Sequence, residues 1–101
     1  MGRTVVVNSG SARDLEAFKA LADEAVTLVK EQLPGTETYE CYIDEATSRF
    51  TWHEEYASDE AIVAHLQAMI ASGLFDTLPE VADFEKLACA VVEAAAPTYH
   101  E

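Results

Sequence analysis

The residues whose types could support chemistry lie together in the middle of the chain. Trp52, His53 and Glu54 are consecutive, and His65 follows shortly afterwards. Histidine has an unperturbed pKa of about 6.5, so its imidazole can accept or release a proton close to neutral pH. An imidazole that points inward, beside a strand that carries a carboxylate and aromatic rings, would be suited to proton transfer in an apolar setting.

The inward orientation of His65 is predicted from the segment around it. Ser58 is a good N-cap, and Asp59 and Glu60 place negative charge on the first helical turn, where the helix dipole favours it. The helix is expected to end near Ala71. Its apolar residues recur at helical spacing, at Ile62, Leu66, Met69 and Ile70. His65 shares their face and is therefore expected to point toward the core.

Two strands are predicted immediately before this helix. Residues 36–43 are rich in Thr, Tyr and Ile, and residues 49–56 return as the partner strand after a hairpin loop at 44–48. Because side chains alternate along a strand, Trp52 and His53 are expected on opposite faces of the sheet.

The N-terminal part of the chain is predicted to add a strand and a long helix. The β-branched run at 4–7 suits a short buried strand, closed by turn-forming residues that end at Ser11. Ser11 is expected to cap the helix, with Asp14 as the acid of a weak capping box. The amphipathic helix continues through Val29 and ends before Pro34.

The C-terminal part is ambiguous between helix and strand. Leu74, Phe75 and Leu78 form an apolar cluster that indicates a further helical turn. Residues 87–92 suit a short buried strand, while the wider segment from residue 84 also suits a helix, and periodicity alone does not decide. A final strand would complete a β-α-β-β-α-β unit. The predicted fold is therefore an α+β, ferredoxin-like sandwich with a four-stranded antiparallel sheet.

Length and composition indicate a single domain that spans residues 1–101. Half of the residues are hydrophobic, but no apolar run approaches the roughly 18 residues that a membrane span needs. No signal peptide precedes the first predicted strand, so the protein is expected to be cytoplasmic. Cys41 and Cys89 each fall in a predicted strand, and reduced, packed thiols are expected there.

The charge of the chain argues against nucleic acid as a partner, and the spacing of its acidic, His and Cys residues argues against a metal site. The net charge is −13, from 19 acidic residues against six Lys and Arg. Nucleic-acid binding needs clustered cations, and these six are scattered. No spacing of acidic, His or Cys residues matches a calcium loop or a zinc motif, so no metal site is expected. The acidity indicates a well-solvated surface.

The chain resembles the antibiotic biosynthesis monooxygenase family, within the dimeric α/β-barrel superfamily. The resemblance rests on Leu33-Pro34-Gly35-Thr36 leading into Tyr39, on the segment 54–61, and on His65, and it covers nearly the whole chain. It implies a homodimer whose sheets pack face to face and a pocket between sheet and helices in each subunit. It also implies no cofactor, since many members use neither metal nor flavin. A sheet with one uncovered apolar face independently favours a dimer.

The resemblance also implies an activity. The quinol and polyketide-phenol monooxygenases of this family oxidise electron-rich aromatic substrates with dioxygen alone. On this interpretation His65 is the base or an orienting hydrogen-bond donor, His53 is the rival candidate, and Asn8 helps to place the ring oxygen. The substrate pocket would be lined by Tyr39, Trp52, Glu54, Leu66, Met69 and Phe75.

Other interpretations stay open. An inward histidine is often a hydrogen-bonded structural residue, and Glu54 could anchor a helix start or a dimer contact. The chain could also be a non-catalytic dimeric ligand-binding or stress-associated α/β-barrel protein. A related branch degrades haem with a strand Asn, a helical Trp and an iron-ligating His. Here His65 occupies the Trp position and residues 69–79 contain no histidine, so haem degradation is not expected, although His65 itself could ligate the iron.

Overall fold

The computed structural model describes the backbone of residues 2–93 and the side chains of residues 3–86. The elements are β1 (Gly2–Ala12), α1 (Leu15–Gln32), β2 (Thr36–Asp44), β3 (Arg49–Tyr56), α2 (Asp59–Ala71), α3 (Leu74–Val81) and β4 (Ala82–Glu93). Within this part of the chain, the strands form one four-stranded antiparallel sheet in the order β2-β3-β1-β4. The predicted ferredoxin-like β-α-β-β-α-β fold is confirmed, with α3 inserted before the last strand.

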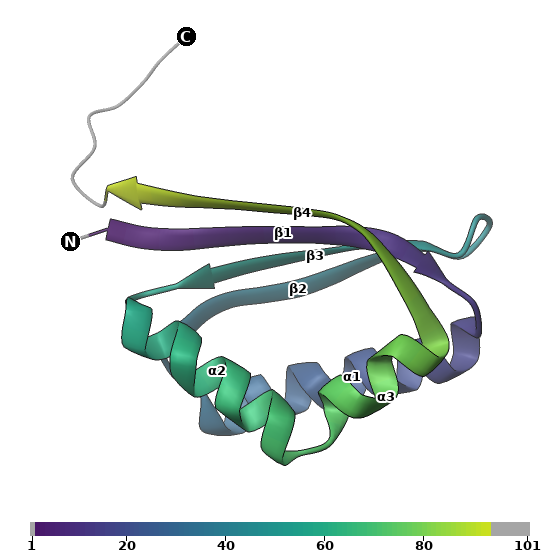
Figure 1. Cartoon of the computed structure of the whole chain (residues 1–101), viewed down its shortest axis with the longest axis horizontal. Helices are drawn as coiled ribbons and strands as arrows, with labels where there is room; N and C mark the ends of the chain where they lie inside the picture. The colour runs from purple at the N-terminus through teal and green to yellow at the C-terminus, as the bar shows by residue number, and fades with distance from the viewer. Residues whose placement is uncertain (1, 94–101) are drawn as a thin grey trace, which may run out of the picture.

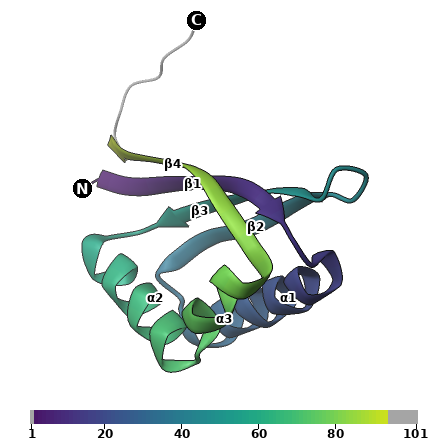
Figure 2. The same ribbon diagram turned by 45° about the vertical axis from the view of Figure 1, so that its right-hand side comes forward.

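The molecule has two layers, a sheet and a group of helices on one side of it (Figures 1 and 2). All three helices of the described chain cover the same face of the sheet, and no described helix crosses the other face (Figure 1). Val5 and Val7 of β1 alternate onto the uncovered face, where they pair with Glu55 and His53 of β3 and remain partly exposed. One apolar layer therefore lies between sheet and helices.

The core fills the space between the two layers. Alternate residues of β3 point into it, and Phe50, Trp52, Glu54 and Tyr56 are all buried. Phe18 of α1 has 0% of its surface exposed, and its ring stacks on Phe50 with the centroids 4.4 Å apart. The period-two burial of β3 is the pattern expected of a strand with one face against a core.

The start of α2 is as predicted. The Ser58 hydroxyl accepts a hydrogen bond from the Ala61 amide at 3.2 Å, and Asp59 and Glu60 occupy the first turn. An N-cap of this kind satisfies one of the amides that a helix start leaves without an intrahelical partner. The chain therefore enters α2 at the position that places His65 over the sheet.

The predicted start of α1 was wrong. The cap is Asp14, whose carboxylate accepts from the Ala17 amide at 3.1 Å, and Ser11 belongs to β1. The strand continues through the turn-forming residues because β3 on one side and β4 on the other supply ladder partners along its length. A central strand with two neighbours overrides a local preference for turns.

The C-terminal ambiguity is resolved in favour of a strand. β4 begins at Ala82 and runs antiparallel to β1 as far as Glu93, and residues beyond it lie outside the described part. Ahead of it, Leu74, Phe75 and Leu78 belong to an eight-residue helix, α3, rather than a single turn. The residue before α3 is Gly73 with φ of 82°, in the left-handed region that favours glycine.

Two close backbone approaches require glycine. A Cβ on Gly10 would lie 2.0 Å from the Asp83 carbonyl oxygen, at the position where the register between β1 and β4 shifts. A Cβ on Gly35 would lie 2.7 Å from the Cβ of Ala61 on α2. Gly35 therefore allows the start of β2 to approach the first turn of α2 closely.

No single helix of the described chain is long and apolar enough to cross a membrane. Of the described helices, only α2 and α3 taken together, bent by 75° at the break between them, have the length and apolar composition of a possible membrane span.

Candidate active site

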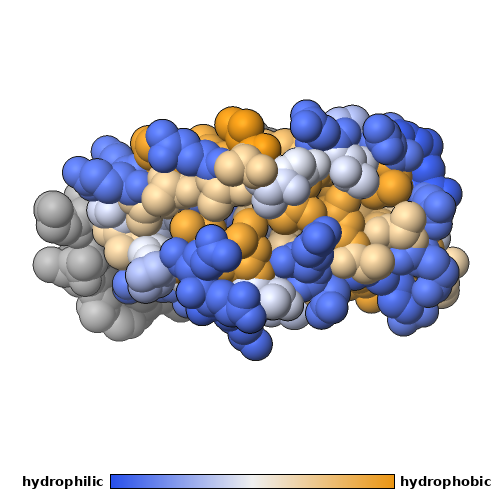
Figure 3. All heavy atoms as spheres, turned by 90° about the horizontal axis from the view of Figure 1, so that it is seen from below, coloured by the Kyte–Doolittle hydropathy of each residue, from blue (hydrophilic) through white to orange (hydrophobic). Residues whose placement is uncertain are grey.

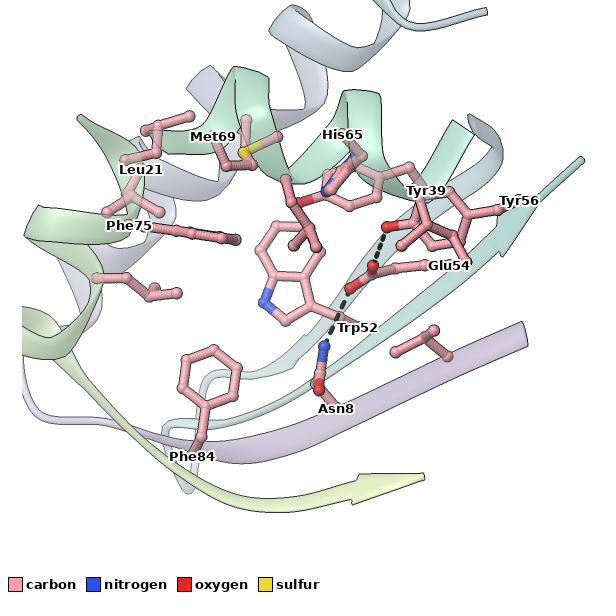
Figure 4. Close-up of a pocket in the computed structure, with 16 residues that line it drawn as sticks. Asn8, Leu21, Tyr39, Trp52, Glu54, Tyr56, His65, Met69, Phe75 and Phe84 are labelled. Carbon is pink, nitrogen blue, oxygen red and sulfur yellow. Dashed lines mark hydrogen bonds between the residues drawn. The ribbon is translucent and has the colours of Figure 1, made fainter. Parts of the chain in front are cut away.

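A cavity of about 340 Å³ lies between the sheet and the helices. Six of the described elements and the start of β4 contribute lining residues, and most of those residues are apolar. The side chains labelled in Figure 4 point toward a common space, from the strands on one side and from the helices on the other. The cavity is therefore built by the tertiary packing of the whole domain.

The structure brings together eight of the nine residues that the sequence suggested for this site. The eight that line the cavity are Asn8, Tyr39, Trp52, Glu54, His65, Leu66, Met69 and Phe75. His53 is the exception. It lies on the uncovered face of the sheet, where its Nε2 is 2.8 Å from an oxygen of Glu55. Alternation along β3 separates it from the cavity, and His53 is no rival to His65 there.

Glu54 is held at the cavity wall by two hydrogen bonds. The Asn8 side-chain amide donates to one carboxylate oxygen at 3.0 Å, and the Tyr56 hydroxyl donates to the other. Both bonds are drawn in Figure 4. Burial raises the pKa of Glu54, while the bonds from Tyr56 and Asn8 act in the opposite direction. Glu54 thus belongs to the cavity itself, and neither the start of α2 nor the outer face of the sheet holds its carboxylate.

His65 sits above the sheet between two tyrosine rings. Its ring centroid is 5.0 Å from that of Tyr39 and 5.2 Å from that of Tyr56. Its Nδ1 lies 3.5 Å from the Thr36 hydroxyl oxygen at the start of β2. The side chain is 4% exposed, and burial lowers the pKa of His65 to about 4. The imidazole is consequently uncharged at neutral pH.

The two tyrosines at the site stay protonated at neutral pH. Burial raises the pKa of Tyr39 and of Tyr56 well above the ordinary value, and the negative charge of Glu54 raises both further. Tyr39 also packs on Trp52, with ring centroids 4.9 Å apart. The site therefore combines neutral phenols, a neutral imidazole and one buried carboxylate with a wall of aromatic rings.

The predicted apolar face of α2 is only partly buried. Met69 is 1% exposed and lies in the core beside His65. Leu66 lines the cavity although it is 44% exposed, and Ile70, at 64% exposed, lies on the outer surface. The inward prediction for Ile70 was wrong, because only His65 and Met69 of α2 are buried, a narrower stripe than its sequence indicates.

Several lining residues were not singled out from the sequence. Tyr56 is not among the predicted site residues, and strand alternation from Glu54 is the signal that places it in the same cavity. Phe84 lies at the start of β4, where its ring meets Phe50 with centroids 5.1 Å apart. Its segment was ambiguous, so no facing direction followed from the sequence. Leu21 enters from α1, which is the predicted amphipathic helix.

Outside the cavity, the described residues include a free thiol but no cluster of potential metal ligands. Among the residues that the structure describes, no three His, Cys, Asp or Glu side chains are grouped so that they could hold a metal ion. Cys41 is a partly buried free thiol on β2, and burial raises its pKa to about 12. The side chain of Cys89 lies outside the described residues.

Comparisons with known proteins give a consistent family and fold. A family model described as antibiotic biosynthesis monooxygenase matches residues 3–93. A search of curated proteins finds no match.

Three solved structures illustrate the shared fold. SnoaB from Streptomyces nogalater, described as a cofactor-independent oxygenase, is similar with a TM-score of 0.76 and 11% identity over 97% of this chain and 100% of that one. Rv0793 from Mycobacterium tuberculosis has a TM-score of 0.71 and 21% identity over 97% of both chains. Protein SO0527 from Shewanella oneidensis has a TM-score of 0.70 and 20% identity over 90% of this chain and 93% of that one. At these identities the likeness concerns the fold.

Proposed function

The chain belongs to the antibiotic biosynthesis monooxygenase family, and we propose that it is a cofactor-independent monooxygenase that oxidises a small quinol or polyphenolic aromatic with dioxygen. The observation that carries this proposal is the cavity of about 340 Å³, in which a neutral imidazole and a held carboxylate face aromatic walls. The description of SnoaB as a cofactor-independent oxygenase supports chemistry of this class on the same fold.

The proposed reaction begins with loss of a phenolic proton. His65 is the proposed acceptor because its imidazole is uncharged and faces the cavity from α2. Asn8 is proposed to orient the reacting ring oxygen, and Glu54 to accept a hydrogen bond from a second hydroxyl of the substrate. Trp52 and Tyr39 are proposed to support the flat ring. Aromatic neighbours bury the flat face of a ring ligand and exclude water from it.

The substrate anion supplies the electrons for oxygen activation. An electron-rich phenolate transfers an electron to dioxygen, and the resulting pair combines to form a carbon–oxygen bond. Loss of the ring hydrogen and cleavage of the oxygen–oxygen bond yield a quinone and one water molecule. One phenol and one dioxygen are consumed for each quinone and water formed. The protein's part is to bind the ring, accept the proton and shield the anion from bulk water.

Oxygen uptake tests this proposal. The unaltered protein, His65→Ala and the matched control His53→Ala are compared with a panel of hydroquinones and anthrols. Monooxygenation predicts uptake with no oxygen returned by added catalase, because water rather than peroxide is the second product. His65→Ala should lose about 10²- to 10⁴-fold in rate, the range ascribed to a general base. His53→Ala should not, since that ring lies on the other face of β3.

Two results contradict the proposal in different ways. Uptake that survives in His65→Ala would show that this imidazole is not the base. A panel without any uptake above the uncatalysed rate would favour the second candidate, a non-catalytic ligand-binding protein. One observation supports that alternative: Asn8, Glu54 and Tyr56 satisfy one another's hydrogen bonds within the cavity wall. A mutually satisfied set can be purely structural.

We also propose that the protein is a homodimer formed through the uncovered face of the sheet. The partly exposed Val5 and Val7 lie on that face in the central strand, and no described helix covers them. Burial of such a face against a second copy removes apolar surface from water. Light scattering at micromolar concentration should give twice the mass of one chain, and a monomer would contradict the assignment. A Val7→Glu variant should shift the protein toward monomer.

A further inference from the structure

We propose that the cavity selects an uncharged hydroxyaromatic ligand, whose hydroxyl group donates a hydrogen bond to Glu54, and that it rejects aromatic ligands bearing a carboxylate, sulfate or phosphate group. This inference deepens the proposed function and rests on it for the identity of the ligand site. It concerns recognition alone, so binding tests it separately from catalysis.

The first argument is the charge of the cavity. Glu54 lines it, and among the described side chains no lysine or arginine does. Four described cations form ion pairs with carboxylates outside the cavity, and these are Arg3, Arg13, Lys19 and Arg49. His65 remains neutral at physiological pH. An anionic ligand would therefore lose its hydration without gaining a counterion, and it would lie near a carboxylate in a chain of net charge −13.

The second argument is the geometry of Glu54. Its side chain is 8% exposed, and each carboxylate oxygen accepts one hydrogen bond from the wall, from Asn8 and from Tyr56. A carboxylate offers about four acceptor positions, so two remain after these bonds are made. Figure 4 shows the carboxylate between its two partners and beside Trp52, at the edge of the shared space. A hydroxyl on a ring stacked along Trp52 is a suitable donor to a remaining position.

The third argument is the direction in which the ligand can extend. Leu66 of α2, Phe75 of α3 and Phe84 of β4 all line the cavity, and they are 44%, 38% and 44% exposed. The cavity therefore opens between these elements, and its mouth is apolar. Figure 3 shows apolar side chains exposed among hydrophilic ones on the helical side of the molecule. A fused-ring ligand would place its hydroxyl end at Glu54 and its hydrocarbon end at this mouth.

Calorimetric titration without oxygen tests the recognition rule. The probes are 2-naphthol, 2-methoxynaphthalene and 2-naphthoate at pH 7.5, which share a ring system and differ in donor and charge. We expect 2-naphthol to bind most tightly. The methyl ether should bind about tenfold more weakly, because it cannot donate to a charged acceptor. The carboxylate should bind at least a hundredfold more weakly.

Variants assign the effect to one side chain. Glu54→Gln removes the charge and keeps the size, so the preference for 2-naphthol over its methyl ether should shrink and 2-naphthoate should gain at least tenfold. Glu55→Gln is the matched control, since Glu55 follows on the same strand and lies on the uncovered face. It should leave the order of the three ligands unchanged. The ligand series on the unaltered protein remains decisive even if Glu54→Gln does not fold.

The outcomes separate this inference from the proposed function. If 2-naphthol fails to bind, or if 2-naphthoate binds equally well, the recognition rule is overturned. An unchanged order in Glu54→Gln overturns the role of that residue. A protein that shows the expected order but consumes no oxygen keeps the recognition rule and loses the monooxygenase assignment. A protein that consumes oxygen but does not show this order of binding loses the recognition rule and keeps the monooxygenase assignment.

Discussion

The Nδ1 atom of His65 on α2 and the hydroxyl oxygen of Thr36 at the start of β2 lie 3.5 Å apart in the buried layer of the protein. These residues belong to elements that are separate in the chain, and the contact joins the helix to the sheet beside the cavity. Both side chains are buried, Thr36 at 8% and His65 at 4% exposed. Protonation of the His65 imidazole is therefore coupled to the packing of α2 on the sheet.

This coupling predicts a pH-dependent stability. The pKa of His65 is about 4 in the folded protein, below its usual value near 6.5, so the unfolded chain binds the proton more readily between these limits. The free energy of unfolding should fall as pH decreases from about 6.5 to about 4, by an amount on the order of 3 kcal/mol from this group. Urea titrations across that range measure it.

A variant isolates the contribution of the imidazole. His65→Gln has no group that titrates there, so its stability should vary less steeply over the same pH range. The raised pKa of Glu54 has the opposite effect on stability, but it is present in both proteins and cancels in their difference. His53→Gln, on the uncovered face, should retain the steeper dependence. Equal slopes for the unaltered protein and His65→Gln would refute the prediction.

Phe18→Ala should be strongly destabilising. The ring is fully buried, stacks on Phe50 and meets the edge of Trp52 with centroids 6.3 Å apart. Truncation of a buried phenylalanine typically costs about 3–5 kcal/mol in the free energy of unfolding. Val63→Ala on α2, where the side chain is 52% exposed, is the surface control and should change stability by less than about 0.5 kcal/mol. Chemical denaturation compares the two, and similar losses would mean that Phe18 is not central to the core.

Gly35→Ala should destabilise the junction between β2 and α2. The added Cβ would meet the Cβ of Ala61 at 2.7 Å, which forces one element to shift. Overpacking of this kind costs about 1–3 kcal/mol. Ala61→Gly removes the opposing atom, so the double variant should lose less stability than the sum of the single changes. Strict additivity in the measured free energies of unfolding would argue against this contact.

Cys41 should react slowly with iodoacetamide in the folded protein. The thiolate is the reactive form, and burial raises the pKa of Cys41 to about 12, so little thiolate is present at pH 8. Peptide mass spectrometry after timed alkylation follows this one site. Addition of urea should accelerate its modification strongly. A rate in the folded state equal to that in urea would show that the thiol is accessible.

Most of the fold followed from local patterns in the sequence. Ser58 is predicted as the N-cap of α2 because a hydroxyl residue directly before two acidic residues and a helical repeat is typical of an N-cap. The pairing of β2 with β3 followed from two β-rich runs around a short loop. The position of Trp52 and His53 on opposite faces followed from alternation along β3, and the cavity residues of that strand share this origin.

Features that depend on contacts between segments far apart in the chain were harder to predict from the sequence. The extension of β1 to Ala12 depends on β3 and β4, which supply hydrogen bonds to residues that locally favour a turn. The exposure of Ile70 depends on how wide a stripe of α2 packs against the rest of the domain, and helical periodicity carries no such information. Phe84 lines the cavity from a part of β4 whose backbone packs against Gly10 of β1 too closely for a Cβ at that position. Each of these is set by packing between segments far apart in the chain.

The chain contains one tryptophan, and Trp52 stands in the wall of the cavity with 4% of its surface exposed. All indole emission from this protein therefore originates beside the ligand site. Its fluorescence spectrum is a built-in optical signal, so occupancy of the cavity can be followed in real time without a dye or an engineered label.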